Sequence, residues 1–399
     1  MVPLLVLQTL PQPSVFSPNN ALVTLSKRLD RSRFAMIVSV PREGLLTQAL
    51  REVGTPVYRV PGLRTFRRHD ALWRFPVVAI RLARLARRVR ARLVVSNHAE
   101  LGPFADAVAR LNRLPWICFL RQADRPPRYY EKYRVARADA VVGVSEAALS
   151  AYRAYLKERR LVGNPQRVIH TGIDVPKLDL RRRSAPGERS IGSEKHSPVI
   201  GTVGLRGVKR PELLLEILSK IRHRTPAIRC IFIGGAEPQE LARLRALAER
   251  LGVSDSVNFP GQQREMDTWY EAMNVYAHTS RSEGLPKVVL EAMAHALPVV
   301  AFRVGGIAEA VAEDETGFLC PEGDLNAFAG AMEHLLTDGV LARRMGEAGR
   351  IRIEHHFSAR AMGQDMMALF DDVLREHDNR RSVSPLKTRQ SPGSDERTE

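Results

Sequence analysis

The chain has 399 residues, of which 44% are hydrophobic and 26% charged. This length and composition predict two folded domains with sizeable cores and exclude a chain that is disordered throughout. The formal net charge of +17 favours partners rich in phosphate, such as nucleotides, anionic lipids or nucleic acid. The three cysteines, Cys118, Cys230 and Cys320, are far apart in the sequence, which argues against a disulfide framework and against a Cys-rich zinc site.

The N-terminal residues predict neither a signal peptide nor a membrane span. Residues 1–8 have no basic segment before their short apolar run, and no run of 18 apolar residues occurs in the sequence. We therefore expect a cytoplasmic protein.

The first 180 residues alternate between short apolar runs and amphipathic stretches. The runs are residues 4–7, 35–40, 57–60, 93–96 and 116–119. Such alternation is typical of a parallel sheet with helices on both faces. We therefore predict a Rossmann-like domain over residues 1–180. Residues 181–197 are polar and rich in Gly, Pro and Ser, and we predict that they form a linker.

A second series of the same kind predicts a second doubly wound α/β domain over residues 198–358. Its apolar runs are residues 199–203, 230–233, 257–259, 275–278 and 298–302. A further helix is expected over residues 359–376. Residues 377–399 have little apolar content, so we predict a disordered tail there.

The segment from Ser280 to Ala301 is the most informative part of the sequence. Pro286 favours a first helical turn, and the backbone amides around it would then face a phosphate at the positive end of the helix. Glu283 precedes that turn, whereas Glu291 lies inside it among apolar residues and needs a partner, such as sugar or ribose hydroxyls. The alternative is that Glu283 is an ordinary first-turn residue and Glu291 a solvated one.

This segment resembles the E-x7-E signature of the family 4 retaining glycosyltransferases. The resemblance continues in residues 139–145, 169–174, 200–210, 305–309 and 316–324. It implies the GT-B fold, in which two domains face each other across a cleft, with the helix over 359–376 crossing back to the first domain. It also implies a hexosyltransferase-like enzyme that moves a sugar from a UDP- or GDP-sugar to a glycan or glycolipid acceptor, in surface polysaccharide or glycolipid biosynthesis.

The resemblance also implies roles for individual residues. Glu291 would bind the ribose, Glu283 would contact the donor sugar, and Arg206 and Lys209 would neutralise the departing diphosphate. Cations aimed at a group that gains negative charge stabilise the transition state more than the ground state. The alternative for Arg206 and Lys209 is an ordinary solvated loop. The remaining donor-binding candidates are Gly204, Gly284, Leu285, Pro286, Lys287 and Val288.

The first domain departs from the family pattern at two places. Where the family has a Gly-Gly turn, this chain has Asn19 and Asn20, which tolerate the left-handed conformation such a turn needs. Where the family has a catalytic-region His, this chain has Arg121, and His98 ends the preceding strand. These four residues are candidates for the acceptor or catalytic region, although a lone His at a strand end is also compatible with a structural role.

Several other functions lose support from the sequence. No D-x-D motif and no cluster with metal-ligand spacing occurs, so we expect neither a metal nor a cofactor. No Walker loop or G-x-G-x-x-G is present, and Ser145 lacks the setting of a hydrolase nucleophile. The remaining rivals are a glycogen-synthase-like polymerase, a sugar epimerase, and a non-catalytic, basic membrane-binding protein on the same scaffold. Nucleic acid is not expected as a partner, because no basic strand carries interspersed aromatic residues.

Residues 73–92 form a basic amphipathic pattern. At helical spacing Arg74, Arg81, Arg84, Arg88 and Arg92 share one stripe, beside an apolar face of Phe75, Val78, Leu82, Leu85 and Val89. An ordinary surface helix explains the apolar face but does not require aligned arginines. We therefore predict that this helix binds an anionic membrane surface, on the inner face of the cytoplasmic membrane.

Overall fold

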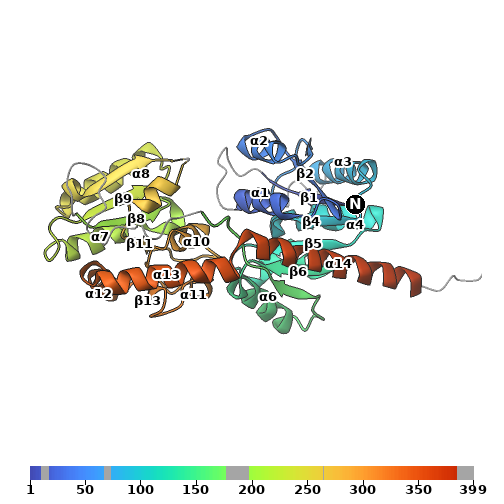
Figure 1. The fold of residues 1–399 in the computed structure, drawn as a ribbon. Coiled ribbons are helices and arrows are strands. Elements are labelled where there is room, and N and C mark those ends of the chain that lie inside the picture. The colour runs from blue at the N-terminus through green and yellow to red at the C-terminus, as the bar shows by residue number, and fades with distance from the viewer. Residues whose placement is uncertain (10–17, 67–72, 177–196, 264, 384–399) are drawn as a thin grey trace, which may run out of the picture.

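The computed structural model describes residues 1–9, 18–66, 73–176, 197–263 and 265–383, and the structural statements below refer to these residues. They form two α/β domains that lie side by side, each built on one parallel sheet (Figure 1). The last helix runs from the second domain back across the first.

The first domain contains a seven-stranded parallel sheet in the order β3-β2-β1-β4-β5-β6-β7. Its strands are β1 Val2–Leu7, β2 Phe34–Val40, β3 Val57–Arg59, β4 Leu93–Ser96, β5 Trp116–Leu120, β6 Ala140–Gly143 and β7 Gln166–Val168. Strand β1, which lies between β2 and β4, places Leu4 opposite both Met36 and Leu93, and all three side chains are buried. Strands buried on both faces consist largely of Val, Ile and Leu, which explains why continuous apolar runs identified most of this sheet.

Helices cover both faces of the first sheet. They are α1 Pro18–Arg28, α2 Leu45–Glu52, α3 Arg74–Arg88, α4 Gly102–Asn112, α5 Pro127–Lys132 and α6 Glu146–Glu158. Residues of α3, α4 and α6 pack in one apolar cluster with the sheet. Residues of α1 and α2 pack in the other, together with the last helix of the chain, α14 Ala359–Val383.

The second domain contains a six-stranded parallel sheet in the order β10-β9-β8-β11-β12-β13. Its strands are β8 Val199–Val203, β9 Arg229–Ile233, β10 Val257–Gly261, β11 Val275–His278, β12 Val299–Phe302 and β13 Gly317–Cys320. Its helices are α7 Pro211–Ile221, α8 Pro238–Arg250, α9 Asp267–Glu271, α10 Lys287–Ala294, α11 Ile307–Ala310, α12 Leu325–Thr337 and α13 Gly339–His356. The prediction of two doubly wound domains is therefore confirmed.

The C-terminal helix is longer than the sequence indicates. It continues to Val383, so the prediction of a disordered tail was wrong for residues 377–383. Ion pairs explain the extension: Arg380 pairs with Glu376 one turn earlier (3.2 Å), and Asp378 pairs with Arg92 of the first domain (2.8 Å). Residues 384–399 lie outside the described residues, as does the predicted linker apart from Ser197.

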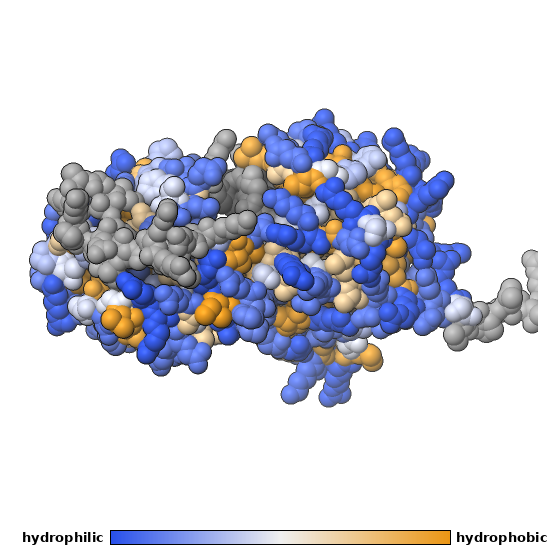
Figure 2. Space-filling model, in the orientation of Figure 1, coloured by the Kyte–Doolittle hydropathy of each residue, from blue (hydrophilic) through white to orange (hydrophobic). Residues whose placement is uncertain are grey.

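The exposed face of α3 differs in part from the predicted arginine stripe. Arg81, Arg84 and Arg88 are exposed, but Arg74 is buried, because its aliphatic stem packs beside Gly62. The same exposed face carries Trp73, Val77 and Ile80, whose exposed fractions are 67%, 46% and 46%. Figure 2 shows hydrophobic areas between hydrophilic ones on this part of the first domain. None of the helices in the described part of the chain is both long and apolar enough to cross a bilayer.

Candidate active site

Glu283 lies in the loop between β11 and α10 and is held by three side chains. Its Oε1 atom is 2.7 Å from Lys209 Nζ, 3.1 Å from His278 Nε2 and 2.7 Å from Ser280 Oγ. The Glu283 side chain is 13% exposed, and His278 is buried at the end of β11. The structure therefore brings together the predicted residues Glu283 and Lys209 and adds His278 and Ser280, which the sequence analysis did not identify.

The protonation states of this group follow from its contacts. Burial alone would raise the pKa of Glu283, but Lys209 and His278 lower it well below its ordinary value. Burial and Lys209 lower the pKa of His278, which is therefore neutral and donates its Nε2 proton to the carboxylate. Glu283 is thus a fixed, ionised carboxylate whose second oxygen, Oε2, remains for a ligand.

Lys209 ends a short 3-10 helix over Gly207–Lys209, beside the turn that follows β8. Gly204 allows this arrangement, because its φ is +103° and a Cβ atom there would lie 3.1 Å from Lys209 Cγ. Arg206 is on the same loop but pairs with Glu237 at 3.0 Å, and its side chain is 48% exposed. The structure therefore joins Lys209 to Glu283 directly, whereas Arg206 and Glu283 form no hydrogen bond or ion pair within the described residues.

Helix α10 begins one residue later than predicted. Pro286 is its N-cap, with ψ at 105°, so it precedes the first helical turn instead of forming it. The first hydrogen bond of the turn runs from the Val289 amide to the Pro286 carbonyl (3.0 Å), and the Lys287 and Val288 amides have no backbone partner within the described residues. Gly284, Leu285 and Pro286 are buried. The amides of Lys287 and Val288 are therefore the groups that can face an anion.

Glu291 is paired, as predicted for a carboxylate in an apolar helix. Its Oε1 lies 2.8 Å from Lys287 Nζ, one turn earlier, and its Oε2 accepts a hydrogen bond from Tyr270 OH at 3.1 Å. Tyr270 in turn stacks on His295, with ring centroids 4.9 Å apart. The Glu291 side chain is 27% exposed, so a ligand can still reach the carboxylate.

On the first domain, Arg121 directly follows β5 and is bound to Asn97. Its Nε donates to the Asn97 carbonyl at 2.8 Å, and a second guanidinium nitrogen donates to the Asn97 side-chain oxygen. The guanidinium also lies over the Phe119 ring, 4.9 Å from its centroid. Burial lowers the pKa of Arg121 to about 10, so the group stays charged at neutral pH.

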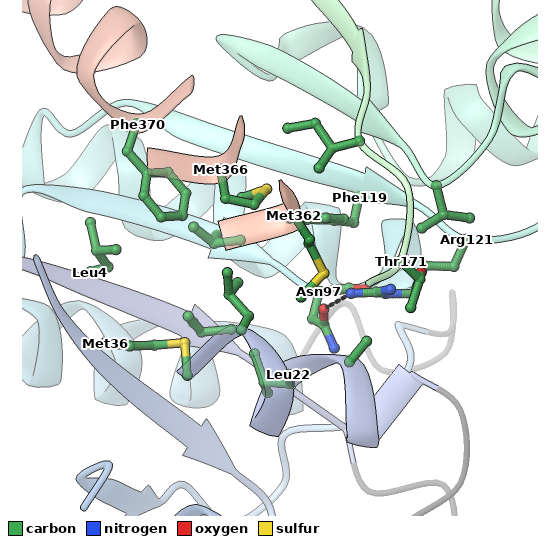
Figure 3. A pocket seen from close by; sticks show the side chains of 16 residues that line it. Leu4, Leu22, Met36, Asn97, Phe119, Arg121, Thr171, Met362, Met366 and Phe370 are labelled. Carbon is green, nitrogen blue, oxygen red and sulfur yellow. Dashed lines mark hydrogen bonds between the residues drawn. The ribbon is translucent and has the colours of Figure 1, made fainter. Parts of the chain in front are cut away.

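A small cavity lies between the first sheet, α1 and α14. Its volume is about 20 Å³, which is room for about one water molecule. Figure 3 shows Asn97, Arg121 and Thr171 together at one end of it, whereas its other labelled residues are apolar: Leu4, Leu22, Met36, Phe119, Met362, Met366 and Phe370. Asn97 directly follows β4 and Arg121 directly follows β5, so the polar end lies where these strands end.

The remaining candidates of the first domain have different environments. His98 follows β4, and its Nε2 atom is buried without a hydrogen-bond partner among the described residues. Burial and the neighbouring Arg121 lower its pKa to about 3, so it is neutral. Asn19 and Asn20 lie in the first turn of α1, so the prediction of a left-handed turn there was wrong. The turn is replaced by a helix that starts at Pro18, a residue suited to a first helical position.

The candidate residues of the two domains lie on loops that meet at glycines. A Cβ atom on Gly284 would lie 2.2 Å from the Arg121 carbonyl oxygen, so only a glycine allows this approach of the two domains. A Cβ atom on Gly306 would lie 2.8 Å from Ser145 Cβ. The loop that carries Glu283 therefore packs directly against the loop that carries Arg121.

Two features bear on metal and thiol chemistry. Among the residues that the structure describes, no three His, Cys, Asp or Glu side chains come together in an arrangement that could hold a metal ion. Cys118, Cys230 and Cys320 are free thiols and buried, which agrees with the predicted lack of a disulfide framework.

Comparison with known sequences matches both domains. The family profile described as glycosyl transferases group 1 matches residues 188–352, and that of glycosyltransferase family 4 matches residues 19–177. A D-inositol 3-phosphate glycosyltransferase of Corynebacterium urealyticum is 37% identical over 181 residues, 43% of each chain. An N-acetyl-alpha-D-glucosaminyl L-malate synthase of Bacillus anthracis is 26% identical over 249 residues, 62% of this chain and 63% of that one. The chain spans about half the length of the D-inositol 3-phosphate glycosyltransferases that it matches.

Solved structures match over nearly the whole chain. Anabaena HepE in complex with UDP and glucose has a TM-score of 0.77 at 18% identity, covering 93% of this chain and 100% of that one. A glycosyltransferase from Rickettsia africae has a TM-score of 0.79 at 17% identity, covering 94% and 99%. These likenesses establish the fold, and the family profiles match each of its two domains. The chain therefore belongs to the family 4 glycosyltransferases and has their two-domain GT-B fold.

Proposed function

We propose that this protein is a retaining glycosyltransferase that moves a sugar from a UDP- or GDP-sugar to a glycan or lipid-linked acceptor in surface polysaccharide or glycolipid biosynthesis. The observation that carries the proposal is the Glu283 carboxylate, which Lys209 and His278 hold ionised beside the first turn of α10. The relatives named as glycosyltransferases support the reaction class. The neighbours solved with UDP and with UDP-glucose support a nucleotide-sugar donor.

In this proposal the second domain binds the donor. Glu291 accepts hydrogen bonds from the ribose hydroxyls, and the Lys287 and Val288 amides face the diphosphate. Glu283 contacts the donor sugar. Glu283 is the counter-ion of Lys209, and a diphosphate would offer the ammonium a second anion. Arg206, on the exposed side of the same loop, adds a further cation.

The catalytic contribution of Lys209 follows from where charge develops. When the bond between the sugar C1 and the diphosphate oxygen breaks, negative charge grows on the diphosphate, while the acceptor hydroxyl oxygen forms the new bond to C1 and gives its proton to the departing diphosphate. A positioned ammonium and helix amides stabilise that charge more in the transition state than in the ground state. We propose that these groups replace a metal ion, so that the reaction needs no cofactor.

A donor panel tests the proposal. Purified protein is incubated with UDP- and GDP-sugars, with and without candidate acceptors, and release of free UDP or GDP is measured. We expect acceptor-dependent release with at least one donor, a product that keeps the anomeric configuration of the donor, and activity that survives EDTA. An inverted product, or loss of activity with EDTA that Mn²⁺ restores, would contradict the mechanism.

We also propose that the exposed face of α3 holds the enzyme on the inner face of the cytoplasmic membrane. Arg81, Arg84 and Arg88 present three positive charges, and no acidic residue occurs in the helix. Each arginine near an anionic surface contributes about 1 kcal/mol. The exposed Trp73 and Ile80 add apolar contacts at the first turns of the helix. These turns lie at the sheet edge where the strands end, the edge that also carries His98 and Arg121.

Vesicle sedimentation tests the membrane proposal. We expect the protein to sediment with anionic but not zwitterionic vesicles and to be released by about 0.5 M salt. Changing Arg81, Arg84 and Arg88 to Glu should abolish sedimentation. The matched control changes the exposed Arg343, Arg344 and Arg360 of the C-terminal part of the chain to Glu. Equal loss in both triple variants would mean that net charge, and not α3, determines binding.

A further inference from the structure

We propose that Glu309 is a positioning residue that joins the two domains beside the donor site. Glu309 lies on α11 in the second domain, but its carboxylate caps α6 in the first. Oε2 accepts a hydrogen bond from the Glu146 amide at 2.8 Å, and Oε1 accepts one from the Ala147 amide at 3.0 Å. One carboxylate therefore binds the start of a helix that belongs to the other domain.

The start of α6 is completed by this contact. Ser145, the N-cap of α6, accepts a hydrogen bond from the Ala148 amide at 3.1 Å. The first amides of a helix have no partner within the helix, and the positive helix terminus favours a carboxylate. Ser145 and Glu309 together satisfy three of these amides, so separating the domains would leave the Glu146 and Ala147 amides without their partner.

A third contact places Glu309 next to the two segments in which the chain passes between the domains, around Ile173 and around residues 357–359. His170 Nε2 lies 3.1 Å from Glu309 Oε2, and the His170 ring packs on Phe357 with centroids 4.7 Å apart. Just beyond, the Ile173 amide bonds to the Phe357 carbonyl (3.0 Å), and the Ala359 amide bonds to the Ile173 carbonyl (2.8 Å). Glu309 thus lies between these two segments and the site.

The carboxylate is charged, and its backbone is anchored in the second domain. Burial alone would raise the pKa of Glu309, but hydrogen bonds from His170 and from the Ala147 and Glu146 amides lower it below its ordinary value. Arg352 of α13 donates to the Glu309 carbonyl at 2.8 Å and to the Ala310 carbonyl at 2.9 Å. Loss of the carboxylate should therefore release α6 while leaving α11 in place.

The glycine turn that precedes α11, Gly305 and Gly306, connects Glu309 to Glu283, so a displacement of one would move the other. The Gly306 amide bonds to the Glu283 carbonyl at 3.2 Å. A Cβ atom on Gly306 would lie 1.9 Å from the Gly284 carbonyl oxygen, and one on Gly305 would lie 1.8 Å from that of Glu283. The turn packs so closely on the donor loop that a shift of α6 relative to α11 changes how Glu283 faces the first domain.

The first test needs no ligand and is therefore independent of the proposed function. Glu309→Gln keeps the size of the side chain but removes its charge and one acceptor oxygen. The matched control is Glu315→Gln, the same change at an exposed position whose side chain forms no hydrogen bond or ion pair within the described residues. We expect the Glu146 and Ala147 amides to exchange with solvent about five- to thirtyfold faster in Glu309→Gln. Unchanged exchange would overturn the proposal.

The second test rests on the proposed function and measures positioning. In Glu309→Gln, turnover should fall about tenfold, whereas the dissociation constant for UDP or GDP should stay within about twofold of wild type, since the nucleotide site lies in the second domain. Faster amide exchange with wild-type turnover would overturn the positioning role. If the wild-type protein transfers no sugar, the proposed function fails, and the exchange result alone decides the domain contact. Should Glu309→Gln not fold, His170→Ala, which removes one of the three contacts, is measured in the same way.

Discussion

The two domains hold their polar side chains in different ways. On the second domain each charged group of the site has a partner of opposite charge: Glu283 has Lys209, and Glu291 has Lys287. On the first domain Arg121 binds the neutral Asn97, and His98 is uncharged. The candidate residues of the second domain thus form ion pairs, whereas those of the first domain are one cation and neutral groups. We infer that charge governs donor binding, and that shape and hydrogen bonding govern acceptor choice.

Removing the central carboxylate should have the largest effect. Glu283→Gln keeps the hydrogen bonds from Ser280 and His278 feasible but removes the charge that faces Lys209 and the donor sugar. We expect turnover to fall about 100- to 1,000-fold while the affinity for free UDP or GDP changes less than about threefold. Wild-type turnover in this variant would reduce Glu283 to a structural residue and remove the contrast between the domains.

The next effect concerns donor affinity. Glu291→Ala removes a charged acceptor that Lys287 and Tyr270 orient, so the dissociation constant of the nucleotide sugar should rise about ten- to a hundredfold. Calorimetric titration of the protein with the nucleotide sugar, without an acceptor, measures this dissociation constant directly. Glu249→Ala, an exposed change on helix α8 of the same domain, should leave the constant unchanged. Equal affinity in both variants would rule out a ribose contact at Glu291.

A smaller effect is expected on the acceptor side. Arg121→Lys preserves the charge but cannot keep both guanidinium bonds to Asn97. We expect kcat/KM for the acceptor to fall about tenfold and donor affinity to remain at the wild-type value. Arg128→Lys, at an exposed position on α5, is the control. Weaker donor binding in Arg121→Lys would contradict the inference that only the second domain governs donor binding.

The smallest effect is on stability and depends on pH. The pKa of Glu283 is lower in the folded protein than its ordinary value of 4.5, so its charged contacts stabilise the fold above that pH and lose their effect as the pH falls through the folded value. Compared with Glu283→Gln, the wild-type free energy of unfolding should be higher by about 1–3 kcal/mol at pH 7. Denaturant titrations at several pH values should show this difference shrinking as the solution becomes acidic. If the difference in unfolding free energy did not change with pH, the effect would come from packing and not from charge.

The sequence predicted the elements whose signals are local. Continuous apolar runs identified strands such as β4, β8 and β11 within a residue at either end, because a buried parallel strand needs apolar side chains on both faces. Strands β7 and β13 were not predicted as such, since β7 is short, with two polar residues among its three, and β13 begins with a glycine.

The site was predicted less completely, because its partners come from distant segments. Glu291 needs a partner, but nothing local indicates that Tyr270 supplies it. His278 could have been suspected, because it is the polar last residue of an otherwise apolar predicted strand and lies five residues before Glu283. The burial of Arg74 depends on the turn at Gly62, which helical periodicity does not report.

The return of α14 to the first domain has a consequence for the order of synthesis. Met362, Met366, Leu369, Phe370, Val373 and Leu374 share a core with Leu4, Leu22 and Phe34. While the ribosome is still translating the second domain, the first therefore has an uncovered apolar face, and it cannot finish folding until residues 362–374 have been added. The second domain needs no such late segment for its sheet. The domain that emerges first from the ribosome is thus the last to be completed. A stop codon shortly after residue 358 would remove part of the core of the first domain.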